Sequence, residues 1–574
     1  MVKYLKPFIK ELRYRFSTKP EDLKFQSEVF NAANQWNAIV GRSEDDLSRQ
    51  SNKSVLFVTG YGLGAHFQRI EPLIMMGLYT RGCKITSLYC NKAVPSCEFN
   101  IIGNNNPPAL FELRNGITEE ANCHLCKVCK SNIEATYSNL PVELAVLTDY
   151  INPNAYQEAV RISKLVAFEN FREFVYEGIR IGEEAFASIL RVTFMGEVQD
   201  THINRSLVQR FIVSGILTAI GYEKAMMEIA PDRIVCIHGI YQTHGLAVKV
   251  ANKLGIPVIV VGGGGIRKDT VVVCHNETYH HQLVNESNEV WEQFNVSKEE
   301  KDKTINYALK KRNSGNGADY LSYHPNPIEN SDALYNYCKI NRERKIVSLY
   351  TNVIWDAQIF YEGNVFQDIF DWLFLSIEEL GKNENIWVVI RIHPAESKGG
   401  LPTRQPMLSE IYKRFPVLPD NIRIIPPESD LSSYTLVEES AVNIIYGTKM
   451  GLEIGLMKRP LLICGETFSR NKGYGIDITS KAQYLKILTS VHDYNFELDS
   501  DLRFEKALNY AHFFYFRKMM DMPFDSSRST DKLTINSLQD LFPGKNETVD
   551  VICNGILNLS PFYIGSKEAT ITRQ

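Results

Sequence analysis

The stretch IWVVIRIHP, residues 386–394, predicts the class of fold that this chain adopts. It opens with a continuous apolar run rich in β-branched side chains, which is typical of a strand buried on both faces of a parallel sheet. The run ends at Arg391, His393 and Pro394, and proline cannot continue a strand ladder. We therefore expect a buried strand whose carboxyl end presents a cation and an imidazole. The alternative for His393 is a structural hydrogen bond to a neighbouring carbonyl.

Similar apolar runs occur in two groups, with helical patterns between them, which indicates parallel α/β units. The first group lies at residues 54–60, 84–90, 232–238, 257–262 and 270–275. The second group lies at residues 345–351, 386–393, 422–426, 441–447 and 460–465. We expect an α/β fold in which two doubly wound, Rossmann-like domains face a central cleft. Ligands of such sheets bind at the carboxyl ends of the strands.

The same pattern divides the chain into five parts. We expect a basic amphipathic helix and lead-in at residues 1–50, a first Rossmann-like domain at 51–315, a linker at 316–344, a second Rossmann-like domain at 345–500, and a C-terminal part at 501–574 that packs back across the domains. The linker assignment depends on a polar segment with many glycine and proline turns. The C-terminal part begins with an aromatic helix at 502–520 and contains a weak strand pattern at 549–553.

Composition and charge exclude several classes of function. The chain has 574 residues, of which 44% are apolar and 23% charged, as in ordinary globular proteins. Its net charge of −4 offers no general attraction for nucleic acid. It lacks a signal peptide and a long apolar span, and its cysteines are too sparse for a disulfide scaffold, so we expect a cytoplasmic protein. The basic helix at residues 1–20 fits either the inner face of the cytoplasmic membrane or docking on its own domain.

A second constellation follows the predicted strand at 441–447. Gly447 begins a turn that brings backbone N–H groups, the Thr448 hydroxyl and the Lys449 ammonium to one point, which favours a phosphate. Glu453, one turn further on, can accept hydrogen bonds from two ribose hydroxyls. Together these groups suit a nucleotide. The alternative is an ordinary strand–turn–helix with Glu453 on a solvated face.

At this point the sequence resembles a known family. The segments RIHPAE at 391–396, YGTKMGLE at 446–453, GLMKRP at 455–460 and GYGID at 473–477 resemble donor-domain motifs of bacterial capsule polysaccharide biosynthesis proteins. These are GT-B glycosyltransferases, some of which transfer Kdo or sialic acid from a CMP-sugar. The resemblance implies transfer from a nucleotide-sugar, such as CMP-Kdo or a UDP- or GDP-sugar, to a surface or capsular polysaccharide or a lipid-linked oligosaccharide. It implies no tightly bound cofactor.

The resemblance also assigns roles to residues. His393 and Pro394 match the His-Pro motif of the family, which contacts the nucleotide phosphate. Thr448 matches a Ser/Thr pair whose second member is Lys449 here, and a lysine suits a diphosphate at least as well as a monophosphate. Protein cations can neutralise the leaving phosphate, so no metal is expected. The predicted donor-binding residues are Asn352, Arg391, His393, Pro394, Gly447, Thr448, Lys449 and Glu453.

Two residues are candidates for catalysis. Asp356 ends the segment YTNVIWD, residues 350–356, which follows the first strand of the second domain and can face the donor sugar; a capped loop anchored by Trp355 is the alternative. His66 ends the glycine-rich segment GYGLGAH, residues 60–66, and a neutral imidazole there can take a proton from an acceptor hydroxyl. The same segment fits a dinucleotide fingerprint, but the acidic residue that this fingerprint requires is missing at residues 89–91.

Several other groups keep two interpretations. The loops at 238–244 and 262–265 lie on the predicted cleft side or serve as tight turns. Cys123, Cys126 and Cys129 either hold a structural zinc ion or are unligated thiols. Glu183 and Arg191 are interpreted as an exposed pair on one helix. For the whole protein, a nucleotide-sugar epimerase or hydrolase and a non-catalytic polysaccharide assembly protein remain alternatives to the transferase.

Overall fold

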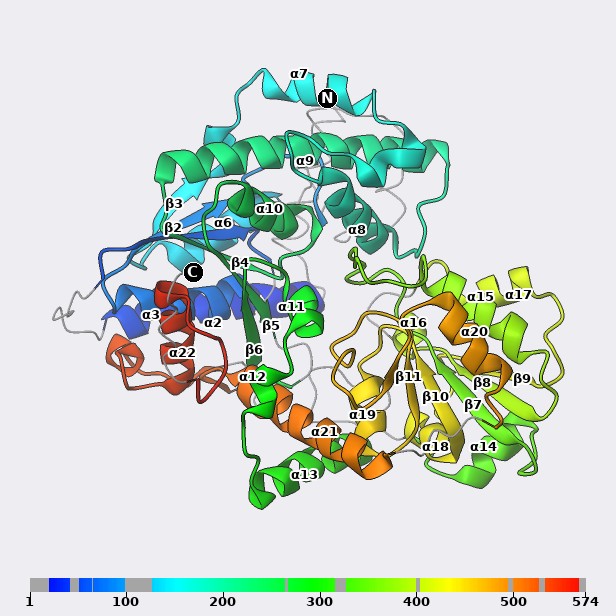
Figure 1. Cartoon of the computed structure of the whole chain (residues 1–574). Helices are drawn as coiled ribbons and strands as arrows, with labels where there is room; N and C mark the ends of the chain where they lie inside the picture. Colours follow the sequence, from blue (N-terminus) through cyan, green and yellow to red (C-terminus); the bar gives the residue numbers. More distant parts are fainter. Residues whose placement is uncertain are drawn as a thin grey trace.

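A computed structural model describes residues 20–41, 51–63, 66–98, 126–263, 267–314, 327–398, 403–493, 499–525 and 532–566. Two sheets, each covered by helices, form its framework, and Figure 1 shows the first in blue to green beside the second in green to orange. The basic helix expected at residues 1–20 falls almost entirely outside the described residues. Within the described part of the chain, no helix combines the length and apolar character that a membrane span requires.

The first sheet has the strand order β13-β6-β5-β4-β1-β2-β3. Its strands are β1 (Ser54–Gly60), β2 (Lys84–Tyr89), β3 (Glu143–Val146), β4 (Arg233–Ile237), β5 (Val258–Gly263), β6 (Thr270–His275) and β13 (Met520–Asp521). Strands β1 to β5 are parallel, whereas β6 runs antiparallel to β5, which differs from the all-parallel expectation. The connection from Gly263 to Thr270 is too short for a parallel crossover, which needs about a dozen residues.

Side chains of β1 alternate between two cores. Val55 and Phe57 belong to a cluster on one face of the sheet, and Leu56 and Val58 belong to a cluster on the other. The helices of this domain are α2 (Pro20–Gly41), α3 (Glu71–Tyr79), α6 (Cys126–Tyr137), α7 (Ala155–Ser163), α8 (Ile181–Thr193), α9 (His202–Ile229), α10 (Leu246–Lys253), α11 (Tyr279–Asn285), α12 (Glu289–Glu292) and α13 (Lys298–Ser314). Both faces of the sheet are therefore covered, as continuous apolar strands require.

The second sheet has the strand order β12-β11-β10-β7-β8-β9, and all its strands are parallel. Its strands are β7 (Lys345–Tyr350), β8 (Ile386–Arg391), β9 (Ile422–Ile425), β10 (Ser440–Ile445), β11 (Leu461–Ile463) and β12 (Ile476–Asp477). Its helices are α14 (Ser331–Cys338), α15 (Ile369–Leu380), α16 (Ala395–Lys398), α17 (Met407–Arg414), α18 (Ser433–Glu439), α19 (Met450–Leu456) and α20 (Lys481–Thr489). All five predicted runs of this group are strands.

The segment predicted as a linker, residues 316–344, contains a helix. In α14, Leu334 and Cys338 are buried in the same apolar cluster as Ile346 of β7. This part of the segment therefore packs on the second sheet, and residues 315–326 lie outside the described residues. The polar composition was misleading because α14 presents only one side to the core.

The C-terminal part runs from the second sheet back to the first. Helix α21 (Ser500–Phe513) packs against α19, continues into the π-helical turn η5 (Phe514–Lys518), and is followed by β13, which pairs with β6. The strand expected at residues 549–553 is wrong, because these residues lie in α22 (Glu547–Asn558). The Asn546 side chain accepts a hydrogen bond from the Val549 N–H and so caps that helix.

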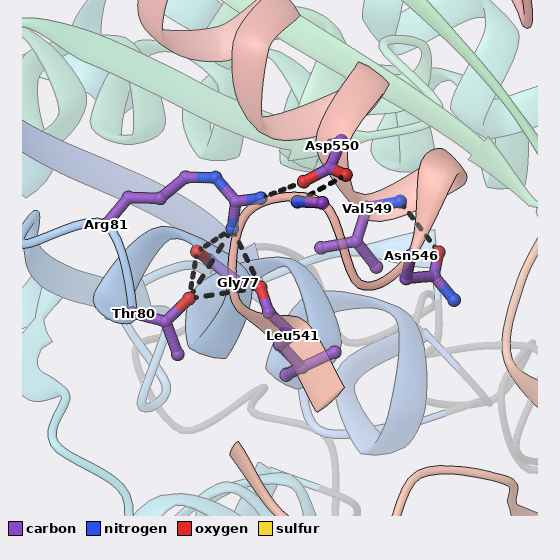
Figure 2. Close-up of polar contacts among 8 residues, drawn as sticks. Gly77, Thr80, Arg81, Leu541, Asn546, Val549 and Asp550 are labelled. Atoms are coloured by element: carbon purple, nitrogen blue, oxygen red, sulfur yellow. Dashed lines mark hydrogen bonds and ion pairs between the residues drawn. The ribbon is translucent and has the colours of Figure 1, made fainter. Parts of the chain in front are cut away.

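A buried arginine holds α22 against α3, as Figure 2 shows. Arg81 is 5% exposed, and its Nη1 donates to the carbonyl oxygens of Gly77 at 2.6 Å and Leu541 at 3.0 Å. Its Nη2 pairs with Asp550, whose other carboxylate oxygen accepts the Gly544 N–H at 3.0 Å. One guanidinium thus joins the start of the first domain to the end of the chain.

We expect Arg81→Met to lower the stability of the first domain by about 2 to 4 kcal/mol, because it leaves the partly buried Asp550 carboxylate and a buried carbonyl without their donor. Thermal or urea unfolding measures the effect. Arg161→Met is the matched control, since Arg161 forms only an exposed ion pair with Glu158 on α7 and should leave the unfolding transition in place. Equal transitions for the two variants would contradict a stabilising role for Arg81.

Candidate functional site

The second sheet has a topological switch point between β7 and β10. From β7 the chain proceeds to β8 and β9 on one side, and it returns to β10, β11 and β12 on the other. Ligands of doubly wound sheets bind outside the carboxyl ends of the strands at such a point. The residues there are Asn352 after β7, His393 after β8, and Gly447 and Thr448 after β10. The structure thus brings together four residues that the sequence predicted as donor contacts.

Hydrogen bonds join these three loops to one another. The His393 backbone N–H donates to Thr351 Oγ1 at 3.0 Å, which ties the loop after β8 to the loop after β7. Asn352 Nδ2 donates to the Gly447 carbonyl at 2.7 Å, which ties the loop after β7 to the turn after β10. Gly447 has a φ of +63°, a conformation that favours glycine. Hydrogen bonds therefore connect the three loops at the carboxyl edge of the second sheet.

The local structure decides which nitrogen of His393 faces a ligand. The Ala395 N–H donates to His393 Nδ1 at 3.1 Å, so Nδ1 is a hydrogen-bond acceptor. A neutral imidazole with Nδ1 as acceptor carries its proton on Nε2. Pro394 contributes by ending the strand, so that Ala395 turns back above the ring. A neutral His393 therefore carries its proton on Nε2.

The turn after β10 adds further polar groups. Thr448 is buried, and its Oγ1 lies 3.5 Å from the Met450 nitrogen, while Lys449 is half-buried. Helix α19 is only seven residues long, so the dipole of a long helix does not act at this turn. Glu453 is 7% exposed, and its Oε2 accepts the Tyr434 hydroxyl at 3.1 Å. The alternative that Glu453 lies on a solvated face is therefore wrong.

Arg391 points elsewhere. Its guanidinium is buried and donates to the carbonyls of Pro426 at 2.6 Å and Ser429 at 3.1 Å and to Ser433 Oγ at 3.3 Å. Burial lowers the pKa of Arg391 to about 10. Pro426 and Ser429 belong to the connection between β9 and α18, and Ser433 is the first residue of α18. Arg391 therefore holds this connection in place, which differs from the phosphate contact expected from the sequence.

Asp356 lies where the two domains meet. Its Oδ1 accepts the Tyr241 hydroxyl at 2.9 Å and forms an ion pair with Arg191 at 3.2 Å, and about half of the side chain is exposed. The Ala357 N–H donates to the same Tyr241 oxygen at 3.0 Å. The Arg191 guanidinium also stacks over Trp355 at 4.8 Å. The carboxylate is thus oriented by two residues of the first domain.

These contacts correct the interpretation of Arg191 as the partner of Glu183. Glu183 instead pairs with Lys249 at 2.9 Å and Arg180 at 3.2 Å. The sequence contains no signal for the contact between Arg191 and Asp356, because the two residues belong to different domains. Tyr241 was missed for the same reason, whereas Thr351 and Tyr434, which contact His393 and Glu453 within the second domain, were missed because these contacts join residues far apart in the sequence.

The glycine-rich loop after β1 is closely packed. A Cβ at Gly60 would lie 2.5 Å from Thr243 Cγ2, and one at Gly62 would lie 2.2 Å from the Cys129 carbonyl oxygen. These two glycines therefore permit close packing against η4 (Tyr241–Gly245) and α6. The side chain of His66, the predicted base, lies outside the described residues.

The cysteine cluster is only partly described. Cys126 and Cys129 lie in α6, and Cys123 lies outside the described residues. Among the residues that the structure describes, no group of three side chains could hold a metal ion. Burial raises the pKa of the nearby Cys90 thiol to about 12, which keeps this sulfur protonated at neutral pH.

Two Rossmann-like domains meet at the carboxyl ends of their sheets. Besides the contacts of Asp356, His281 Nε2 lies 2.8 Å from the Phe360 carbonyl, and the Arg404 N–H donates to the Phe194 carbonyl at 2.9 Å. The first sheet also has a topological switch point, which lies between β1 and β4. This arrangement is the GT-B architecture.

Comparisons with known proteins do not assign an activity to the chain. No protein-family model matches the chain, and no curated protein matches its sequence. Among solved structures, the chain is similar to the beta Kdo 2,4 transferase KpsC of Thermosulfurimonas dismutans, with 12% identity over 54% of this chain and 87% of that chain and a TM-score of 0.32. It is also similar to UDP-GlcNAc 2-epimerase of Neisseria meningitidis, with 12% identity over 80% and 97% and a TM-score of 0.26. For the glycosyltransferase SnogD of Streptomyces nogalater, the identity is 13% over 80% and 95%, and the TM-score is 0.22. Likeness at this level carries no inference about activity, so the function has to follow from the site.

We expect Asn352→Ala to weaken nucleotide binding about fivefold. The substitution removes the hydrogen bond to the Gly447 carbonyl, which is worth about 1 kcal/mol, and so loosens the turn after β10. Isothermal titration calorimetry measures the change. Asn341→Ala is a matched control in the same domain, since Asn341 accepts from Trp387 Nε1 at the start of β8, away from the carboxyl edge. Equal nucleotide affinities for wild type and Asn352→Ala would show that the hydrogen bond between Asn352 and the Gly447 carbonyl is not needed for binding.

Proposed function

We propose that this protein is a glycosyltransferase that binds a nucleotide-sugar at the switch point of the second sheet and transfers the sugar to a glycan acceptor held by the first domain. The observation that supports this most is the connected edge formed by His393, Asn352 and Gly447. An imidazole Nε2–H, a threonine hydroxyl and a lysine ammonium at one sheet edge suit the phosphate of a nucleotide.

The neighbouring residues support a nucleotide rather than an isolated phosphate. Glu453 would accept hydrogen bonds from the ribose hydroxyls, and the Tyr434 hydroxyl would orient its carboxylate. Lys449 suits a diphosphate as well as a monophosphate, so the donor would be a CMP-sugar such as CMP-Kdo or a UDP- or GDP-sugar. The acceptor would be a surface or capsular polysaccharide or a lipid-linked oligosaccharide, reached at the inner face of the cytoplasmic membrane.

The proposed sugar transfer forms one bond to the anomeric carbon and breaks another. An acceptor hydroxyl oxygen forms a bond to the anomeric carbon of the donor, and the bond between that carbon and the phosphate oxygen breaks. The electron pair leaves with the phosphate, where the His393 donor and the Lys449 charge stabilise it. The hydroxyl proton passes to the carboxylate of Asp356, which Arg191 and Tyr241 orient.

The test is calorimetric titration of the full chain with CMP, UDP and GDP, followed by incubation with CMP-Kdo, UDP-GlcNAc and GDP-mannose. If the protein is a transferase, it binds one of the three nucleotides. It also releases this nucleotide from the corresponding nucleotide-sugar faster when an acceptor is present. Turnover that no acceptor accelerates would favour the epimerase or hydrolase. The absence of nucleotide binding would overturn the proposal and favour an assembly protein.

A further inference from the structure

A cluster of polar rings lies on the first-domain side of the domain junction. His238 follows β4, Tyr241 begins η4, and His280 lies in the first turn of α11. The ring centroid of His238 lies 5.7 Å from that of Tyr241 and 6.0 Å from that of His280. Because Tyr241 donates to Asp356, this cluster adjoins the carboxylate proposed to receive the acceptor proton.

The backbone adopts unusual conformations to place these rings. His238, Gly239 and Tyr241 have φ values of 64°, 68° and 62°. Left-handed conformations are unfavourable for residues with a Cβ and concentrate at functional sites. They are held here by the His238 N–H, which donates to the Val261 carbonyl at 3.0 Å, and by Thr278 Oγ1, which donates to the His238 carbonyl at 2.9 Å.

The start of α11 is also firmly placed. The ring of Tyr279 packs so closely on β5 that a Cβ at Gly262 would lie 2.6 Å from it. The His280 ring lies on that of Tyr279, with centroids 4.2 Å apart. His281, the next residue, is occupied by its contact with the Phe360 carbonyl. The orientation of His280 is therefore set by packing rather than by a hydrogen bond of its own ring.

His280 Nε2 is buried and has no hydrogen-bond partner among the described residues. This nitrogen is one of several buried polar atoms without a partner among the described residues, but the charge of Asp356 acts on it, so a ligand held beside Asp356 can supply the partner. Burial lowers the pKa of His280 to about 4, even though the charge of Asp356 opposes this shift. The ring is neutral at physiological pH, so a phosphate gains no ionic attraction from it, whereas a hydroxyl can donate to it or accept from it.

We infer that His280 binds the acceptor, with its Nε2 forming a hydrogen bond to a hydroxyl group of the glycan that receives the sugar. This inference rests on the proposed function and adds the class of group that the first domain recognises, a neutral polyhydroxyl compound beside Asp356. The anionic donor then belongs to the second domain, and the uncharged acceptor belongs to the first.

The test measures nucleotide release from the donor that the full chain accepts, with methyl β-galactoside, methyl N-acetyl-β-glucosaminide or glycerol as acceptor probes. We expect at least one probe to accelerate release by the wild type. His280→Ala should raise the KM for that probe about five- to tenfold, with the KM for the donor and the nucleotide Kd unchanged within twofold. His280→Gln, whose amide reaches the position of Nε2, should recover part of the loss.

His281→Ala is the control for damage to α11, because the neighbouring imidazole already contacts Phe360. Because His281→Ala also removes one contact across the domain junction, its KM for the acceptor should rise by much less than that of His280→Ala. The inference is overturned if no probe accelerates release, if His280→Ala leaves the KM for the acceptor unchanged, or if His281→Ala raises it equally. A failure of the proposed function would be recognised separately, since calorimetry would then detect no nucleotide binding at all.

Discussion

His393→Ala is expected to raise the Kd of the bound nucleotide about 10- to 100-fold while leaving the thermal unfolding transition close to that of the wild type. In the proposed arrangement the Nε2–H of His393 donates to the nucleotide phosphate, and a hydrogen bond to a charged group contributes about 1.5 to 3 kcal/mol. Its ring is half-buried at a strand end rather than in an apolar cluster, so its removal leaves the core intact. Calorimetry with CMP, UDP and GDP measures the loss.

Two further variants separate the roles of the two nitrogens of His393. In His393→Asn the amide lies near the position of Nδ1, so it can still accept from the Ala395 N–H but has no donor at the position of Nε2. In His393→Gln the amide reaches the position of Nε2. We expect the asparagine variant to bind as weakly as His393→Ala and the glutamine variant to bind more tightly than either.

His492→Ala is the matched control in the same domain. His492 lies on the surface after α20, where its Nε2 pairs with Asp493 at 2.9 Å. Its substitution should leave nucleotide affinity unchanged. If His393→Ala binds nucleotide as tightly as His492→Ala does, the switch point is not the donor site.

Asp356→Asn is expected to reduce sugar transfer by about 10²- to 10⁴-fold, the range associated with the loss of a general base. The asparagine has nearly the same shape and keeps an oxygen that can accept the Tyr241 hydroxyl, but it cannot take a proton from the acceptor. The nucleotide Kd should change less than twofold, because Asp356 does not face the phosphate in the proposed arrangement. Nucleotide release from the accepted donor measures turnover.

The alternative role of Asp356 is to join the domains, and it predicts a different pattern. Arg191→Met removes the ion pair with Asp356, and Tyr241→Phe removes the hydrogen bonds with Asp356 and the Ala357 N–H, but both variants keep the carboxylate, so we expect losses of only about five- to tenfold. Asp332→Asn changes an exposed acid on α14 and controls for the loss of one negative charge. It should leave the rate of sugar transfer unchanged. Equal losses for Arg191→Met, Tyr241→Phe and Asp356→Asn would assign Asp356 to domain contact alone.

Ten strands of the two sheets were predicted because burial on both faces of a parallel sheet leaves a continuous β-branched run in the sequence, whereas the short strands β3, β12 and β13 were not predicted. Residues 386–391 and 440–445 show this directly. The run at 549–553 misled because so short an apolar segment fits a helix as well. Its apolar residues continue at Ile556 with helical spacing, and Asn546 caps the helix. The direction of β6 depended on a short connection, which apolarity alone does not reveal.

Part of the candidate site followed from the same reasoning. His393, Gly447 and Asn352 were predicted because each directly follows a parallel strand, and parallel strands end at one edge. The side chain of Arg391 could not be placed in this way. The residue also lies at a strand end, but its guanidinium is directed to carbonyls in the connection after β9, which only the packed sheet places there.

Local sequence was sufficient for what depends on short-range chemistry, namely the positions of the strands, their carboxyl ends and the polar residues that follow them. It was insufficient for the contacts of Asp356 with Tyr241 and Arg191 and for the isolated Nε2 of His280. The contacts of Asp356 join residues more than a hundred positions apart, such as Tyr241 and Asp356, whose separation is 115 residues. Hydrogen bonds and desolvation are set by whichever groups finally lie within a few ångströms, and only the packing of one domain against the other decides that.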